Sequence, residues 1–262
     1  MKKTKSGPRI LILDIETAPL VAHVWGLWEN NVALNQIQQD WHVMSWAAKW
    51  LDEKNVMYMD QRNAKDVTDD KKILQAIWKL IDEADIIIGQ NQRAFDLKKL
   101  NARFVLNRMK PPSSYRTIDT KALASKKFKF SSNKLEYMTE KLNKKYKKLK
   151  HNKFPGHSLW TECLKGNKAA WREMEIYNRH DVLATEELYK ILAPWDVSID
   201  MNVYSDRGEN LCQSCGSHKL KRWGYRYTNA GKYQRYICDD CGAENKGTTN
   251  LLSKEKKASL KK

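Results

Sequence analysis

The sequence predicts an α/β protein in which a mixed β-sheet is flanked by helices and followed by a small cysteine-rich module. Up to Pro194, short apolar runs rich in β-branched residues alternate with amphipathic stretches of helical period. Beyond that point the sequence becomes polar and contains two cysteine pairs with CxxC spacing. A chain of 262 residues with 41% hydrophobic content is long enough for one sizeable core and one small satellite.

The first three predicted strands form an antiparallel meander. Residues 9–15 are apolar and β-branched and end at acidic residues, which predicts a buried strand that delivers polar groups to an edge. Residues 41–52 and 53–60 predict two further strands around an Asp-Glu-Lys-Asn turn.

Helices and short strands then alternate. Residues 71–84 predict an amphipathic helix, because apolar side chains recur at 73, 74, 77, 78, 80 and 81. A short strand, a helix stopped by Pro111 and Pro112, another short strand and a last long helix are expected at 85–89, 97–109, 115–119 and 167–192. A meander, a crossover helix and two more strands make up the RNase H-like arrangement, with helices on both faces of a mixed sheet.

Composition predicts four segments along the chain. Residues 1–196 form the sheet-and-helix domain, and the polar, strand-poor residues 197–208 form a linker. Residues 209–246 form the four-cysteine module. Residues 247–262 form a basic tail, whose lysine-rich end is expected to be disordered on its own.

The charge of the chain favours a polyanionic partner. Lys and Arg outnumber Asp and Glu by 48 to 31, which gives a formal charge of +17 and makes nucleic acid the leading partner class. No apolar run approaches the roughly 20 residues of a membrane span, and the N-terminal apolar stretch breaks at Asp14 before a signal sequence is complete. We therefore expect a cytoplasmic protein without a membrane partner.

Two acidic residues at the end of the first predicted strand are spaced in a way that suits metal binding. Asp14 and Glu16 are two residues apart on a strand, so their carboxylates project to the same side. Two acids held together repel unless a cation lies between them, and hard divalent ions prefer such oxygen ligands. Taken alone, the pair is better explained by a solvated strand end that carries two surface acids.

Two further acidic positions have ordinary alternatives as well. Asp96 lies at the start of a helix, where the helix dipole already favours a carboxylate. Tyr177 and Asp181 are four residues apart on a helix and share a face, as a plain surface pair would. Asp119 ends a strand near the same edge and is expected to cap the helix that follows.

Three segments together resemble the motifs of DnaQ-like 3′-to-5′ exonucleases of the Tyr subclass. They are LDIET at 13–17, NQRAFD at 91–96 and YNRHD at 177–181. The resemblance covers about residues 8–194, includes AAKWL, NKLEYMTEKL and HSLWTECLKGNKAAW, and is similar to the proofreading domains of family B DNA polymerases and their stand-alone relatives.

The resemblance implies a two-metal active site that holds two Mg²⁺ or Mn²⁺ ions. Asp14 would bridge both ions, Glu16 and Asp181 would complete one site, and Asp96 would serve the other directly or through water. Tyr177 would orient the attacking water. Such a site hydrolyses phosphodiester bonds from the 3′ end and releases 5′-mononucleotides.

Neighbouring residues complete the resemblance. The related His subclass has its base five residues before the last Asp, where this chain has Ile176, which favours the Tyr subclass. Asn91 and Phe95 resemble positions that contact the terminal nucleotide, and Thr17 a position beside the 3′ end. His180 is expected to be structural.

Two other features bear on substrate binding. Residues 121–153 contain twelve Lys and two acids, which suits phosphate contacts and equally suits a solvated helix face. Cys163 is expected to be buried and without function.

The four remaining cysteines, Cys212, Cys215, Cys238 and Cys241, predict one structural Zn²⁺ site. Four thiolates at this spacing can close a tetrahedral site, whereas a redox pair would need only two cysteines. The module resembles the zinc ribbons of transposases and transcription-related proteins.

The segment between the cysteine pairs predicts nucleic-acid binding by the ribbon. It holds six Lys or Arg and no acid, interleaved with aromatic residues, so that Trp223, Tyr225 and Arg226 are candidate contacts. A ribbon that docks a polymerase or another replication protein is the alternative.

The sequence therefore predicts an exonuclease acting on single-stranded or frayed DNA 3′ ends. RNA 3′-end trimming is the near alternative, because discrimination depends on contacts with the 2′-hydroxyl. A zinc-ribbon regulator on a non-catalytic nuclease scaffold is the alternative from another class.

Overall fold

The computed structural model describes residues 7–149, 153–205 and 210–260, which fall into two compact units. The larger unit is Arg9–Leu188. The smaller one begins at Tyr189 and also includes Gly7 and Pro8. The division therefore falls inside the last long helix, earlier than the boundary at residue 196 that composition suggests.

A five-stranded mixed sheet forms the centre of the larger unit, with the strand order β5-β4-β1-β6-β7. β1 pairs antiparallel with β4, which pairs antiparallel with β5, so the predicted meander is confirmed. β6 and β7 extend the sheet in parallel with β1. The strands are β1 (Ile10–Thr17), β4 (Val43–Trp50), β5 (Met57–Asp60), β6 (Ile86–Gly89) and β7 (Arg116–Asp119).

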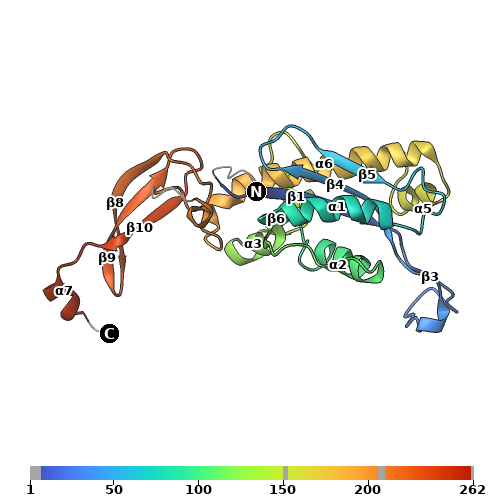
Figure 1. Cartoon of the computed structure of the whole chain (residues 1–262), viewed down its shortest axis with the longest axis horizontal. Coiled ribbons are helices and arrows are strands. Elements are labelled where there is room, and N and C mark those ends of the chain that lie inside the picture. The colour runs from blue at the N-terminus through green and yellow to red at the C-terminus, as the bar shows by residue number, and fades with distance from the viewer. Residues whose placement is uncertain (1–6, 150–152, 206–209, 261–262) are drawn as a thin grey trace. The chain divides into compact units, whose positions relative to one another are not determined.

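Helices cover both faces of this sheet (Figure 1). On one face, α1 (Lys71–Glu83) and α2 (Asp96–Leu106) bury Leu11, Leu13 and Ile15 of β1 in the main core. On the other face, α5 (Ser158–Leu164) and α6 (Lys168–Leu192) pack around Met44 of β4. Because side chains alternate along a strand, Asp14 and Glu16 point to this second face.

Two shorter helices and one projecting arm complete the larger unit. The helices are α3 (Thr120–Lys127) and α4 (Leu135–Leu142). The arm, for which the sequence makes no prediction, contains β2 (Val21–Ala22), a 3-10 turn at Leu34–Gln36 and β3 (Ile37–Gln39). It extends from the end of β1 (Figure 1). Between β2 and the 3-10 turn, Trp25, Leu27 and Trp28 are exposed.

The smaller unit contains a three-stranded antiparallel sheet, β10-β9-β8 (Figure 1). Its strands are β8 (Leu220–Thr228), β9 (Gly231–Cys238) and β10 (Glu244–Asn250). β10 continues past residue 246, where the module was expected to end, because Asn250 still pairs with Tyr233.

The structure also describes parts of the expected tail and linker. The tail, expected to be disordered, contains α7 (Lys254–Ala258), which Ser253 caps by accepting a hydrogen bond from the Lys256 amide at 3.1 Å. In the expected linker, Ile199 and Met201 are buried, and 3-10 turns form at Ala193–Trp195 and Met201–Tyr204. Residues 206–208 of that linker and 261–262 of the tail lie outside the described residues.

No helix in the described part of the chain is both long enough and apolar enough to cross a membrane.

Candidate active site and four-cysteine centre

Three separate segments bring the predicted acids together. β1 supplies Asp14 and Glu16, α2 supplies Asp96 in its first turn, and α6 supplies Asp181. The Asp96 Oδ1 accepts a hydrogen bond from the backbone N–H of Ile15 at 3.1 Å, which ties the start of α2 to the end of β1. Asp96 and Asp181 are almost fully buried.

The acids perturb one another strongly. Burial raises the pKa of Asp14 well above its usual value, and the charges of Asp96, Glu16 and Asp181 raise it further. Burial and the nearby Asp181 raise the pKa of Glu16 to about 8. Burial also raises the pKa of Asp96 to about 7, against the hydrogen bond from the Ile15 amide. Close, buried carboxylates of this kind bind a proton or a cation readily.

Lys148 supplies a positive charge to this cluster. Its ammonium lies 2.5 Å from the Asp181 Oδ2 and 4.5 Å from the centre of the Tyr177 ring. The same charge lowers the pKa of Asp14 and Glu16. Sequence reasoning did not single out Lys148, because it is one of many lysines in a basic stretch, of which residues 150–152 lie outside the described residues.

Tyr177 lies one helical turn before Asp181 and faces the same cluster. Its ring meets Trp160 edge to face at 6.3 Å, and the Trp160 indole N–H donates to the Glu16 Oε2 at 3.1 Å. Burial raises the pKa of Tyr177, so its hydroxyl stays protonated at neutral pH. Ile176, the preceding residue, is exposed.

Asn178 is a buried neighbour that sequence reasoning also missed. Its Nδ2 donates to the Asp14 Oδ2 at 2.6 Å and to the Asp14 carbonyl at 3.2 Å. Its Oδ1 accepts from the Ser45 hydroxyl at 3.1 Å. The amide therefore fixes the orientation of one Asp14 oxygen and leaves the other oxygen available.

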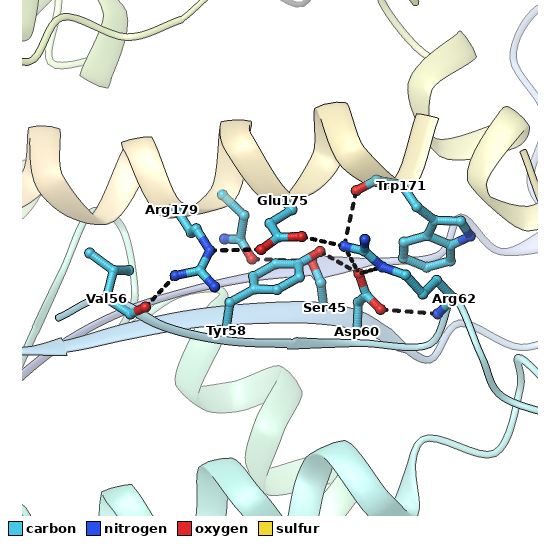
Figure 2. Close-up of polar contacts among 9 residues, drawn as sticks. Ser45, Val56, Tyr58, Asp60, Arg62, Trp171, Glu175 and Arg179 are labelled. Carbon is cyan, nitrogen blue, oxygen red and sulfur yellow. Dashed lines mark hydrogen bonds and ion pairs between the residues drawn. The ribbon is translucent and has the colours of Figure 1, made fainter. Parts of the chain in front are cut away.

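A polar network holds α6 against β5 (Figure 2). Arg62 lies between Asp60 and Glu175, with nitrogen-to-oxygen distances of 2.6 Å to both carboxylates. Glu175 also accepts from Arg179 at 3.0 Å, and Arg179 donates to the carbonyl of Val56. The network fixes the helix that carries Tyr177, Asn178 and Asp181.

A pocket of about 620 Å³ lies beside the acids and contains Thr17, one of the three substrate residues that the sequence predicts in the larger unit. Pockets of this volume accommodate small ligands. The sequence did not predict the other lining residues of the pocket, two of which are tryptophans. They are Ala18, Pro19, Leu20, Trp41, Lys99, His157 and Trp160.

The other two predicted substrate residues lie near this site. Phe95 is partly exposed, and the Lys99 ammonium is 5.5 Å from the centre of its ring. The Asn91 Oδ1 accepts from the Lys121 ammonium at 3.1 Å. Asp119 caps α3 as expected, accepting from the Lys121 and Ala122 amides at 3.0 and 3.2 Å. Cys163 is buried, also as expected.

The acidic cluster fits divalent metal ions by its chemistry. It offers only carboxylate oxygens, which Mg²⁺ and Mn²⁺ prefer, and the mutual repulsion of these oxygens favours a cation. Among the described residues, no three acids bring their oxygens within 4.8 Å of one another, as the four cysteine sulfurs do. Metal binding at three acids would therefore require side-chain rotations, and binding at Asp181 would compete with its contact to Lys148.

The four cysteines form a ready-made tetrahedral arrangement. All four sulfur atoms lie within 4.8 Å of one another, with Cys212–Cys241 at 3.6 Å and Cys215–Cys238 at 3.7 Å. A tetrahedron of Zn–S bonds near 2.3 Å has edges of about 3.8 Å, whereas a disulfide needs about 2.05 Å. The cluster is therefore compatible with a zinc ribbon.

Both turns that carry these cysteines have the same construction. Gly216 and Gly242 each follow the second cysteine of a pair, and each donates to the carbonyl of the first cysteine at 2.8 Å. Both glycines have a positive φ, +74° and +76°, a conformation that side chains disfavour. The Asn245 amide lies 3.6 Å from the Cys212 sulfur, and hydrogen bonds from the Cys215 thiol and nearby amides lower the pKa of Cys212 to about 4.

The predicted ribbon contacts divide between different sides of β8. Trp223 and Tyr225 are exposed. Arg226 alternates with Tyr225 along the strand and lies on the opposite face, where its guanidinium is 3.4 Å from Glu244. The structure therefore does not group Arg226 with Tyr225.

Comparisons with known proteins agree with this fold. A family model described as the RNase H superfamily matches residues 36–193. None of the curated proteins compared with the chain matches it. Among solved structures, the chain is similar to the family B DNA polymerase from the hyperthermophilic archaeon Pyrobaculum calidifontis, with a TM-score of 0.51 and 15% sequence identity. The similarity covers 88% of this chain and 32% of the polymerase, and at this identity it concerns the fold alone. Because the family model matches more than half of the chain, the protein belongs to the RNase H superfamily.

Proposed function

We propose that this protein is a two-metal-ion 3′-to-5′ exonuclease that removes 5′-mononucleotides from single-stranded or frayed DNA 3′ ends. The observation that carries the proposal is the assembly of Asp14, Glu16, Asp96 and Asp181 from three separate segments into one buried cluster. Buried acids with raised pKa values are expensive for a fold to keep, and they are typical of functional sites.

The residues around the acids suit hydrolysis at a phosphodiester. Two bound Mg²⁺ or Mn²⁺ ions would supply charge stabilisation for the attacking and leaving oxygens. Asp14, Glu16, Asp96 and Asp181 would hold them, with Asn178 fixing Asp14. The Tyr177 hydroxyl, protonated and directed to the cluster, would hold the attacking water by a hydrogen bond.

The adjacent pocket suits the terminal nucleotide. Trp41 and Trp160 offer flat apolar surfaces for a base, and Lys99 offers a cation for a phosphate. Thr17, at the end of β1, would contact the 3′ end, and Phe95 and Asn91 would contact the nucleotide from α2 and the turn before it. In the smaller unit, the four cysteines would bind one structural Zn²⁺.

Digestion of a labelled single strand tests the proposal. We expect release of mononucleotides that requires Mg²⁺ or Mn²⁺ and falls by at least about a thousandfold in Asp14→Ala, because one ligand serves both ions. Ile176→Ala is the matched control on α6, since this side chain is exposed, and it should retain full activity. Full activity of Asp14→Ala would reject the proposal. A matched RNA strand in the same assay tests DNA against RNA.

A further inference from the structure

We propose that one face of the ribbon sheet, formed by Arg222, Tyr225, Tyr227 and Lys232, is a binding platform for single-stranded nucleic acid. This inference rests on the proposed function, which makes single-stranded nucleic acid the substrate. It adds a second place on the protein where that nucleic acid binds. We call these four residues the aromatic platform.

Strand register places the four residues on one face. Tyr225 pairs with Gln234 and Tyr227 pairs with Lys232, and partners in an antiparallel pair share a face. A bulge between Arg222 and Tyr225 inserts one extra residue into β8. Arg222 therefore lies on the same side as the two tyrosines, whereas a regular strand would place it on the other side.

The two arginines of the opposite face share one carboxylate within the sheet. Glu244 lies 3.4 Å from Arg226 and 3.6 Å from Arg235, and the Lys246 ammonium is 4.1 Å from the centre of the Tyr233 ring. On the aromatic platform, by contrast, no carboxylate of the described residues lies within 4.0 Å of Arg222 or Lys232. Its cations remain available for phosphates.

The rings of the platform are exposed and lie beside a cation. Tyr225 and Tyr227 are 45% and 69% exposed, and the Lys232 ammonium is 3.8 and 5.9 Å from their ring centres. An exposed aromatic ring next to a lysine can stack a base while the lysine contacts the neighbouring phosphate.

The spacing of the rings favours a single strand over a duplex. Residues two apart on a strand are separated by about 6.8 Å, which is twice the rise of about 3.4 Å between stacked nucleotides. Bases that stack on both rings must separate from one another, which an unpaired strand allows and a duplex resists. A protein partner fits less well, because protein interfaces are poor in lysine and the cation beside both rings is Lys232.

Binding without turnover tests this inference. The protein is the full chain with Asp14→Asn, loaded with zinc and kept without added Mg²⁺ or Mn²⁺. It is titrated into a fluorescein-labelled dT20 oligonucleotide, and fluorescence anisotropy measures the binding. We expect the added double substitution Y225A/Y227A to weaken binding about a hundredfold, or about tenfold for each ring. Y225F/Y227F, which keeps both rings, should bind like the parent and shows that ring loss is the cause.

Matched controls separate the platform from the opposite face. Arg226→Ala should change binding less than about threefold, and a dT20–dA20 duplex should bind more weakly than the single strand. Unchanged affinity in Y225A/Y227A, an equal loss in Arg226→Ala, or preference for the duplex would each overturn the inference. Zinc content and circular dichroism confirm folding of each variant. Because this experiment measures binding and not cleavage, its result stands even if the protein proves to have no nuclease activity. Likewise, a negative binding result does not change the outcome of the cleavage assay.

Discussion

At the scale of single residues, the site is an acidic cluster that needs positive charge. Lys148 provides it in the structure, by its contact of 2.5 Å with Asp181. An ammonium in this position reduces the repulsion among the acids, a role that bound metal ions would take over. Lys148 is therefore expected to matter most when the metals are absent.

Substitution of Lys148 tests this role. We expect Lys148→Met to lower the free energy of unfolding without Mg²⁺ or Mn²⁺ by about 1–3 kcal/mol, because a buried carboxylate loses its partner. Added Mn²⁺ should recover part of the loss. Thermal unfolding with and without Mn²⁺ measures both effects. Lys147→Met is the control, since Lys147 pairs with Glu140 at the surface, and equal melting temperatures for both variants would contradict the role.

The raised pKa values predict how stability changes with pH. The folded pKa of Glu16, about 8, exceeds the ordinary value of 4.5, so the folded protein binds more protons between these values. Stability without Mg²⁺ or Mn²⁺ should therefore fall as the pH rises from about 5 to 8. Melting temperatures across this range check the slope. Glu16→Gln should flatten it, and an unchanged slope in that variant would contradict the assignment.

Asn178 should control metal affinity through Asp14. Loss of a hydrogen bond that orients a metal ligand typically costs about 10–100-fold in metal affinity or activity. We expect Asn178→Ala to raise the Mn²⁺ dissociation constant by at least about tenfold, as measured by calorimetry without substrate. Ser45→Ala removes only the next hydrogen bond in the chain and should have a smaller effect. Equal Mn²⁺ affinity in Asn178→Ala and the parent would show that the contact is only structural.

At the scale of elements, the periodicity of apolar residues in the sequence predicted the strands of the central sheet and the main helices that cover it. Strand alternation placed Asp14 and Glu16 on one side, and helical spacing placed Tyr177 with Asp181, because both depend on local geometry. Lys148, Trp160 and Asn178 were missed. Their contacts with the acids join segments far apart in the chain, which local patterns do not encode.

In the C-terminal part, local contacts add structure that charge alone does not predict. The tail was expected to be disordered from its charge, and in the structure Ser253 caps the short helix α7 and β10 pairs up to Asn250. The arm at 21–39 has no periodic pattern and so gave no prediction.

The ribbon should depend on its metal. We expect Cys238→Ser to lose bound zinc and to unfold the three ribbon strands, because zinc binding at such sites is worth about 10–16 kcal/mol. Zinc content and limited proteolysis measure this. Cys163→Ser, which alters the one cysteine outside the cluster, is the control for zinc content. Full zinc binding by Cys238→Ser would contradict a four-thiolate site.

At the scale of the whole molecule, the two compact units contain two different sets of potential metal ligands. The acidic cluster offers hard oxygen ligands, which suit Mg²⁺ or Mn²⁺, and the ribbon offers soft sulfur ligands, which suit Zn²⁺. Cleavage should therefore be lost by removal of Mg²⁺ or Mn²⁺ alone, while the ribbon stays folded until a stronger chelator removes zinc. The family B polymerase shares the fold over about a third of its own length.

The central claim is directional, metal-dependent hydrolysis, and the products from differently labelled strands test it most directly. With Mg²⁺ or Mn²⁺, a 3′-labelled single strand should release its label at once as a 5′-mononucleotide, while a 5′-labelled strand should shorten in single-nucleotide steps. Both reactions should stop when the divalent ion is withheld. Internal cuts, release of the label first from the 5′ end, or no cleavage at all with either metal would contradict the account.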